Sequence, residues 1–182
     1  MTIRSNLKTR TDDAGGELCP DGRISSPTKD YGGRRIVDVS NYIPYFLVAI
    51  NNALSRGASH LYLQMFGIGI VEWRIVSMLA IEPRISASRI CEVVSLDKSG
   101  TSRGLKQLLA LGYLSFSASK TDPRRKIWWL NTKGYALHDK ILAIALERER
   151  ELIEGVDPED LGTFLKVIRI MHRNVGRISE HD

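Results

Sequence analysis

A strip of hydroxyl-bearing and cationic side chains recurs at helical spacing near the middle of the chain. It lies in the stretch LDKSGTSRGLKQLLALGYL, residues 96–114, and consists of Ser99, Ser102, Arg103 and Lys106. Positions i, i+3, i+4 and i+7 share one face of an α-helix. An arginine on such a face can donate two hydrogen bonds to guanine O6 and N7, and a serine can contact base edges or phosphates. These four residues, the recognition strip, therefore fit the major groove of duplex DNA.

The positive charge of the chain is concentrated around the recognition strip. The sequence of 182 residues has a net charge of +5, whereas residues 97–133 hold eight basic and two acidic residues and carry +6. A localised basic patch on a near-neutral body is expected of a protein that binds a polyanion. A solvated surface face is the alternative reading of the charge. Such faces usually mix both signs, however, and no acid follows Asp97 on this helix.

Two short helices joined by a tight turn are predicted to present the strip. Ser86 is placed to cap a helix over residues 87–94. Asp97 is placed to cap the next helix, where its charge suits the positive end of the helix dipole. Leu105 and Leu108 fall toward the core side of that second helix. The pattern predicts a helix-turn-helix.

A basic hairpin is predicted directly after this motif. Strand patterns cover residues 113–117 and 126–131, and the intervening ASKTDPRR is rich in positive charge. A hairpin with a basic tip, or wing, can contact the minor groove or the DNA backbone. The helix-turn-helix and the hairpin together predict a winged helix that binds double-stranded DNA. The predicted DNA contacts are Ser88, Lys98, Ser99, Thr101, Ser102, Arg103, Lys106, Lys120, Arg124 and Arg125.

Apolar helices are predicted on both sides of the winged helix. Residues 40–66 give a helix about 40 Å long, which a domain of this size cannot bury alone and which indicates a partner subunit. Residues 132–153 give a further helix with apolar side chains on more than one side. In the last helix, residues 158–175, the side chains expected to be buried are Leu161, Phe164, Leu165, Ile168 and Met171.

The predicted fold class is mainly α with a small β-hairpin wing: a winged helix-turn-helix domain plus a helical dimerisation arm. Residues 1–35, rich in Gly, Ser, Thr, Asp and Arg, are expected to form a flexible tail. A single domain over residues 36–182 follows. Its winged helix covers about residues 67–131, and its dimerisation helices cover about 40–66 and 132–175.

Several kinds of chemistry are not expected. The four histidines share no metal-ligand spacing with each other or with the two cysteines, and no phosphate-binding loop, nucleophile motif or catalytic carboxylate pair is present. We therefore expect no metal, no cofactor and no enzymatic activity. The longest apolar run is far short of the roughly 20 residues of a membrane helix, and two cysteines fit a reducing cytosol. A cytoplasmic location without membrane contact is expected, with Cys91 as a buried, inert thiol.

The chain resembles the MarR family of winged-helix transcriptional regulators. The family pattern runs through a helix-turn-helix, a wing that carries Asp-x-Arg, and an L-T-x-x-G motif that opens a long helix. Here SASRICEVVSLDKSGTSRGLKQLLALGYL matches the first part, TDPRRK the second and LNTKG, residues 130–134, the third. The resemblance covers about residues 40–175.

Three positions depart from that pattern. Asn131 stands where threonine is usual, Gly104 where a β-branched core residue is common, and Phe116 where an arginine often stands. Gly104 is expected to weaken helix packing, and Phe116 to remove one possible basic contact. Gly100 and Gly104 flank the recognition strip and each cost the helix about 1 kcal/mol. They also keep the helix slim enough to approach another surface closely.

The resemblance implies a homodimer whose first and last two helices interlock. A two-fold dimer presents two recognition helices roughly 34 Å apart, so the operator is expected to be an inverted repeat. The implied function is a sequence-specific DNA-binding transcriptional regulator, a repressor that a small ligand releases from its operator. The alternative is a winged-helix protein-interaction module without specific DNA readout.

The resemblance also implies a site for that ligand, which is often aromatic or phenolic, between the dimerisation arm and the winged domain. Binding there changes the spacing of the two recognition helices. The candidate contacts are Trp73, Arg74, His60 and Gln64, because an arginine can pair with a carboxylate and a tryptophan can stack on a ring. The alternative is that Trp73 belongs to the core and that Arg74 is exposed or forms a structural ion pair.

Overall fold

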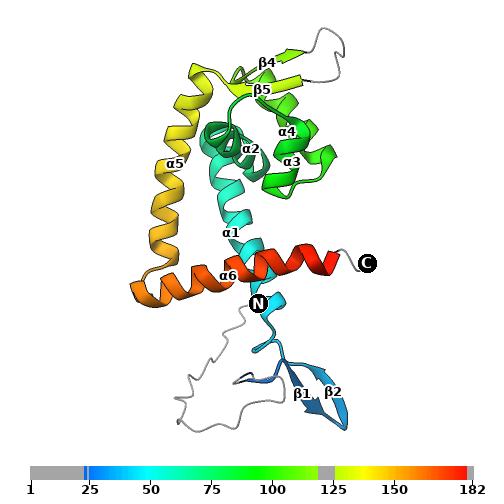
Figure 1. Cartoon of the computed structure of the whole chain (residues 1–182). Coiled ribbons are helices and arrows are strands. Elements are labelled where there is room, and N and C mark those ends of the chain that lie inside the picture. Colours follow the sequence, from blue (N-terminus) through cyan, green and yellow to red (C-terminus); the bar gives the residue numbers. More distant parts are fainter. Residues whose placement is uncertain (1–22, 24, 119–125, 180–182) are drawn as a thin grey trace. The chain divides into compact units, whose positions relative to one another are not determined.

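A computed structural model describes residues 23, 25–118 and 126–179 (Figure 1). The fold is mainly helical with a small antiparallel sheet, which confirms the predicted class. In chain order the elements are β1 (Thr28–Tyr31), β2 (Arg34–Val37), α1 (Ile43–Phe66), α2 (Ile70–Ile81), β3 (Ile85–Ser86), α3 (Ala87–Val94), α4 (Lys98–Ala110), β4 (Leu114–Ala118), β5 (Lys126–Leu130), α5 (Thr132–Leu152) and α6 (Pro158–Ser179). The chain divides into two compact units, residues 1–57 and 58–182, and α1 crosses their boundary.

The first unit contains a hairpin that the sequence analysis did not predict. Strands β1 and β2 pair antiparallel, so the expectation of a flexible tail is corrected for residues 28–35. The turn between them is Gly32-Gly33, with φ of +60° and +74°. Two consecutive residues with positive φ match the right-handed twist of a tight hairpin, and only glycine adopts them freely. The backbone N–H of Gly33 also donates to Asp30 Oδ1 at 3.1 Å.

The second unit is built around the packing of α2, α3 and α4, whose inward residues are almost fully buried. They include Ile75 and Leu79 of α2, Ile90 of α3 and Leu108 of α4. Figure 1 shows α3 and α4 side by side, with the sheet at their end. Val93 near the end of α3 lies outside this core, because it is 46% exposed. The next residue, Val94, packs against the core in its place, four positions after Ile90.

The sheet of the second unit has three strands in the order β3-β5-β4, with β5 in the centre. Strand β4 pairs with β5 from Leu114↔Leu130 to Ala118↔Lys126, close to the predicted hairpin. Strand β3 was not predicted, because two residues are too short to show a periodicity. The predicted wing contacts Lys120, Arg124 and Arg125 lie outside the described residues.

Gly104 packs against α2 inside the fold. A Cβ atom at this position would lie 2.6 Å from Cδ1 of Ile75, which is fully buried. The expectation that Gly104 weakens packing is therefore corrected, since the missing side chain is what lets the two helices approach. The glycine thus allows α4 to pack closely on α2 of the same chain, and not on another molecule. Gly100 is buried as well.

The LNTKG motif joins the sheet to α5. The side chain of Asn131 caps α5, because its Oδ1 accepts from the Gly134 backbone N–H at 3.0 Å, and its Nδ2 donates to the Gly112 carbonyl at 3.0 Å. Asparagine thus caps the helix where threonine is usual. A Cβ atom at Gly134 would overlap the backbone oxygen of Tyr113. The glycine is needed because this strand end lies against the first turn of α5.

The flanking helices expose much of their apolar surface. Within residues 158–178 no residue is buried, and Phe164 is 54% exposed. The expectation that α6 buries five apolar side chains is therefore wrong for a single chain. In the first unit the early turns of α1 expose Tyr45, Phe46 and Val48. Such runs of exposed apolar side chains are typical of a surface that another molecule covers.

In the described part of the chain, no single helix is long and apolar enough to cross a membrane. Helices α1 and α2 meet that composition only as a pair, which is bent by 81° at the break between them.

Substitution of Gly134 by alanine should destabilise the fold by about 1–3 kcal/mol, the usual cost of overpacking a well-packed site. Alanine is the better helix former by about 1 kcal/mol, so the loss must come from the clash with the Tyr113 carbonyl. Ala136→Gly, at an exposed position of the same helix, serves as the control and should cost only the helix propensity. Urea denaturation measures both, and a Gly134→Ala variant more stable than the parent would contradict the close approach.

Candidate nucleic-acid interface

Helix α4 presents the recognition strip outward. Ser99, Ser102, Arg103 and Lys106 are all exposed, and the opposite face of the helix is buried at Leu105 and other positions. The Arg103 guanidinium donates through Nη1 to Ser99 Oγ at 2.5 Å. This contact between positions i and i+4 orders the arginine along the helix. All four side chains of the strip are exposed, as their spacing predicts, and their contact with DNA stays a prediction.

Asp97 begins α4. Its Oδ1 accepts from the backbone N–H of Gly100 at 2.7 Å, as the sequence predicted for a capping residue. The pKa of Asp97 is lowered below its ordinary value of 3.8, chiefly by that bond and further by the Ser99 amide and the charge of Arg103. The acid next to the recognition strip therefore neutralises the helix start, where its charge complements the exposed amides.

Two further predicted contacts lie on the same side of the helix-turn-helix. Ser88 is exposed on the first turn of α3, and Lys98 is exposed at the first position of α4. Ser88, Ser102 and Lys106 line one groove of about 690 Å³ together with the base of the wing. The structure thus brings a residue of α3 and two residues of the recognition strip to one surface.

Thr101 does not belong to this surface. It is only 1% exposed, and its Oγ1 accepts a hydrogen bond from Cys91 Sγ at 3.1 Å. Its assignment as a DNA contact is therefore corrected, because the residue lies four positions before Leu105 on the inward face of α4. Cys91 is partly buried against it, and the inertness of this thiol stays a prediction.

One cation at the base of the wing was not among the predicted contacts. The ammonium of Lys126 lies 4.3 Å from the ring centroid of Phe116 and 5.8 Å from that of Trp128. Lys126 also lines the groove described above. The signal for it was the hairpin register, since Phe116↔Trp128 and Ala118↔Lys126 are alternate pairs and share one face of the sheet. Without the register, the sequence cannot place the lysine over the rings.

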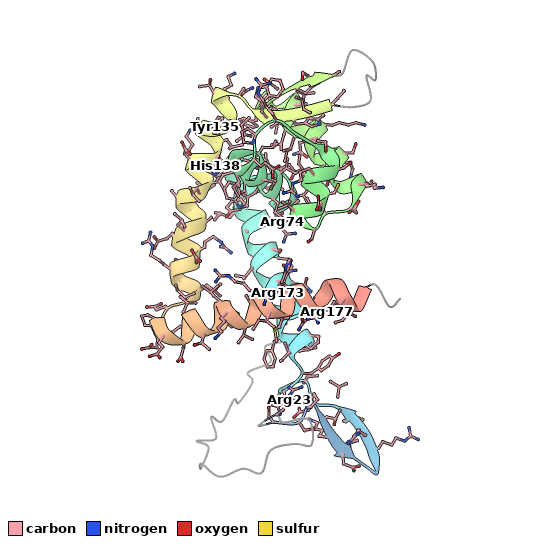
Figure 2. All side chains as sticks on the ribbon, in the orientation of Figure 1. Arg23, Arg74, Tyr135, His138, Arg173 and Arg177 are labelled. Carbon is pink, nitrogen blue, oxygen red and sulfur yellow. The ribbon has the colours of Figure 1, made fainter. Side chains whose placement is uncertain are left out.

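The predicted ligand contacts are only partly brought together. Trp73 of α2 is partly buried, with its ring 6.1 Å from that of Tyr62 and 5.7 Å from that of His138. Arg74 follows it on α2, and Figure 2 labels both Arg74 and His138. His60 and Gln64 are exposed on α1. In the part of the chain that the structure describes, His60 and Gln64 form no hydrogen bond, ion pair or ring contact with Trp73 or Arg74, so a common site stays a prediction.

The described residues also bear on metal binding. No group of three or more His, Cys, Asp or Glu side chains in these parts of the chain could hold a metal ion.

Comparisons by sequence and by structure both find similarity to regulators of the MarR family. Residues 66–125 match the model of the MarR family. A MarR/EmrR family transcriptional regulator from Acinetobacter sp. ADP1 is similar in structure, with a TM-score of 0.71, 26% identity, and coverage of 78% of this chain and 99% of that one. A MarR family regulator from Silicibacter pomeroyi DSS has a TM-score of 0.68 at 23% identity and covers 82% and 97%. The PcaV regulator from Streptomyces coelicolor, solved with its natural ligand, has a TM-score of 0.64 at 18% identity and covers 76% and 96%. No curated protein matches the chain by sequence.

The Asp97 cap should be visible in thermal stability and in its pH dependence. Asp97→Ala should lower the melting temperature at neutral pH, whereas Asp97→Asn keeps an oxygen acceptor and should retain most of it. The folded pKa is lowered, so the ionised carboxylate stabilises the fold at every pH above the unfolded value of about 3.9. That contribution is lost as the pH falls through the lowered folded value.

Differential scanning calorimetry of the three proteins across this acidic range provides the measurement. The difference between the parent and Asp97→Asn should shrink toward low pH. Equal melting temperatures of the parent and Asp97→Ala at neutral pH would show that the cap does not stabilise α4.

Proposed function

We propose that this chain, whose winged helix belongs to the MarR family of transcriptional regulators, is a homodimeric repressor that reads an inverted-repeat operator through α4. The observation that carries the proposal is the recognition strip, with Ser99, Ser102, Arg103 and Lys106 all exposed on one face without an acid among them. Guanidinium and ammonium donors of this kind suit guanine edges and phosphates in the major groove. Regulation of transcription rather than catalysis is the role that fits this surface.

The homodimer is supported by the uncovered apolar side chains of the flanking helices. In α6 they include Phe164, Leu165, Ile170 and Ile178. In the early turns of α1, the exposed residues include Phe46. Burial of these faces would remove apolar surface from water, which favours association by roughly 25 cal/mol per Å² before the loss of translational and rotational freedom is subtracted. A second copy of the same chain supplies the same faces, and a two-fold interface is the commonest way to cover them.

Two-fold symmetry determines the form of the operator. Each protomer brings one α4 to the duplex, and the two helices enter successive major grooves on the same side, about one turn or 34 Å apart. The half-sites are then inverted repeats. Backbone contacts by Ser88 and Lys98 fix the position of the protein, whereas Arg103 specifies sequence.

A small aromatic or phenolic ligand is proposed to release the operator. Support comes from the partly buried ring of Trp73, which lies against Tyr62 of α1 and His138 of α5 and so connects α2 to both neighbouring helices. Arg74 beside it offers a cation for an acidic group. A ligand in contact with Trp73, Arg74, His60 and Gln64 would change how the winged helix is held on α1 and α5. The distance between the two α4 helices would change with it.

Substitution of Arg103 by alanine tests whether this residue recognises bases of the operator. It should weaken binding to the operator by about 1–3 kcal/mol and relax the preference at one base pair of each half-site. Arg150→Ala removes the same charge from α5, where Arg150 is paired with Glu147, and should bind as the parent does. Footprinting on the DNA beside the gene, followed by titration of that operator, measures both. Normal operator binding by Arg103→Ala would favour the protein-interaction module instead.

Substitution of Phe164 by glutamate tests the dimer. A carboxylate on the exposed face of α6 leaves the single chain folded but cannot be buried in an interface without a large desolvation penalty. Sedimentation velocity should show the parent as a dimer and Phe164→Glu as a monomer, and the adjacent exposed control Thr163→Glu as a dimer. A parent that sediments as a monomer would contradict the proposed assembly.

A further inference from the structure

The geometry points to Lys126 as a phosphate-binding residue at the base of the wing, held in place by the rings of Phe116 and Trp128. This inference rests on the proposed function, because the phosphate is one of the DNA backbone. It adds a cation that the sequence analysis did not assign to the DNA interface.

A pair of neighbouring aromatic rings positions the ammonium of Lys126. Phe116 and Trp128 are cross-strand partners on β4 and β5, with ring centroids 5.1 Å apart. Lys126 lies two residues before Trp128 on the same face of β5, and its Nζ sits 4.3 Å from the Phe116 centroid. An ammonium near a ring face is attracted by the negative quadrupole of the ring. Trp128 is buried, so the core holds this ring in place, whereas Phe116, the ring nearer to the ammonium, is partly exposed beside it.

The groove next to that ammonium holds further hydrogen-bond donors. The groove beside it is lined by hydroxyls from Ser88 and Ser102 and by the ammonium of Lys106. Among the described residues that line the groove, none is acidic. Lys106, Lys126 and the serine hydroxyls, Ser86 included, form a donor set without a carboxylate that is suited to a phosphodiester. The set includes positions of α3 and α4 already placed at the DNA surface, so the same backbone strand can reach Lys126.

Phe116 has a different role from the one that the family pattern predicted for this position. The resemblance to the family predicted that phenylalanine here removes a basic contact from the wing. The structure instead places a cation from the neighbouring strand over this ring. A lysine that is already held loses less side-chain freedom when it binds a phosphate than a free lysine does. Phe116 is therefore a positioning residue, and Lys126 is the residue that contacts DNA.

The test uses the full chain and a mixed-sequence duplex, since a phosphate contact does not depend on base sequence. Affinity is measured by fluorescence anisotropy over a series of salt concentrations. Lys126→Met should reduce the slope of log K against log salt by about 0.9 for each protomer bound, because one counterion fewer is released per lost phosphate contact. Lys140→Met, at an exposed position of α5 outside the groove, is the control with the same charge change and should keep the parental slope.

A double-mutant cycle separates positioning from general stability. Phe116→Leu should weaken duplex binding in the parent but have no further effect in Lys126→Met, whereas Phe116→Tyr, which keeps the ring, should bind as the parent does. An unchanged slope for Lys126→Met would overturn the phosphate contact. An equal loss from Phe116→Leu in both backgrounds would overturn the positioning role. A parent that does not bind the duplex even at low salt would overturn the proposed function itself, which is a different result.

Discussion

The close packing of α4 against α2 is the constraint on which the rest of the winged helix depends. At Gly104 the absence of a side chain leaves room for Ile75, and Thr101 and Leu105 complete the inward face. Because this face is buried, the 3.6-residue period of the helix places the recognition strip on the opposite, outward face. The packing of the apolar side in the core therefore determines which side chains of α4 face outward and can contact another molecule.

Electrostatics then determine what the exposed side can bind. The acid at the start of α4, Asp97, is engaged by the amides at the helix start and by the charge of Arg103. The remaining exposed groups of α4 near it are hydroxyls, guanidinium and ammonium. At the base of the wing, Lys126 is held over Phe116 in the same groove as Lys106. Helix and sheet thus contribute cations to one surface, whose long-range field favours a polyanion.

Much of this architecture could be predicted from the sequence, because it depends on local features such as helix caps and strand-forming residues. Caps at Ser86, Asp97 and Asn131 mark where helices begin, and the run of β-branched and aromatic residues around Trp128 marks a strand. Features that depend on contacts distant in sequence could not be predicted. The burial of Gly104 against Ile75 requires knowledge of how α2 crosses α4. The hydrogen bond that Thr101 accepts from Cys91 requires knowledge of how α3 packs on α4, although helical spacing alone places Thr101 on the inward face.

Other differences have similarly physical causes. The hairpin at Thr28–Val37 was missed because its strands carry mixed polar residues, and the Gly-Gly turn was taken as a sign of a flexible segment. The apolar residues of α6 were predicted to be buried because amphipathic spacing does not say whether the covering surface belongs to the same chain. Because Phe164 is exposed in the single chain, a second chain is the proposed covering surface, and this exposure is the main support for a dimer.

The central claim is that two copies of the recognition strip enter the major groove together. Dimethyl sulfate protection on operator DNA tests it most directly, because the reagent methylates guanine N7, the atom that Arg103 would contact. The account predicts two protected guanine clusters in inverted orientation, centred about one helical turn apart. Saturating protein that leaves every guanine N7 reactive, or that protects only a single cluster, would contradict it.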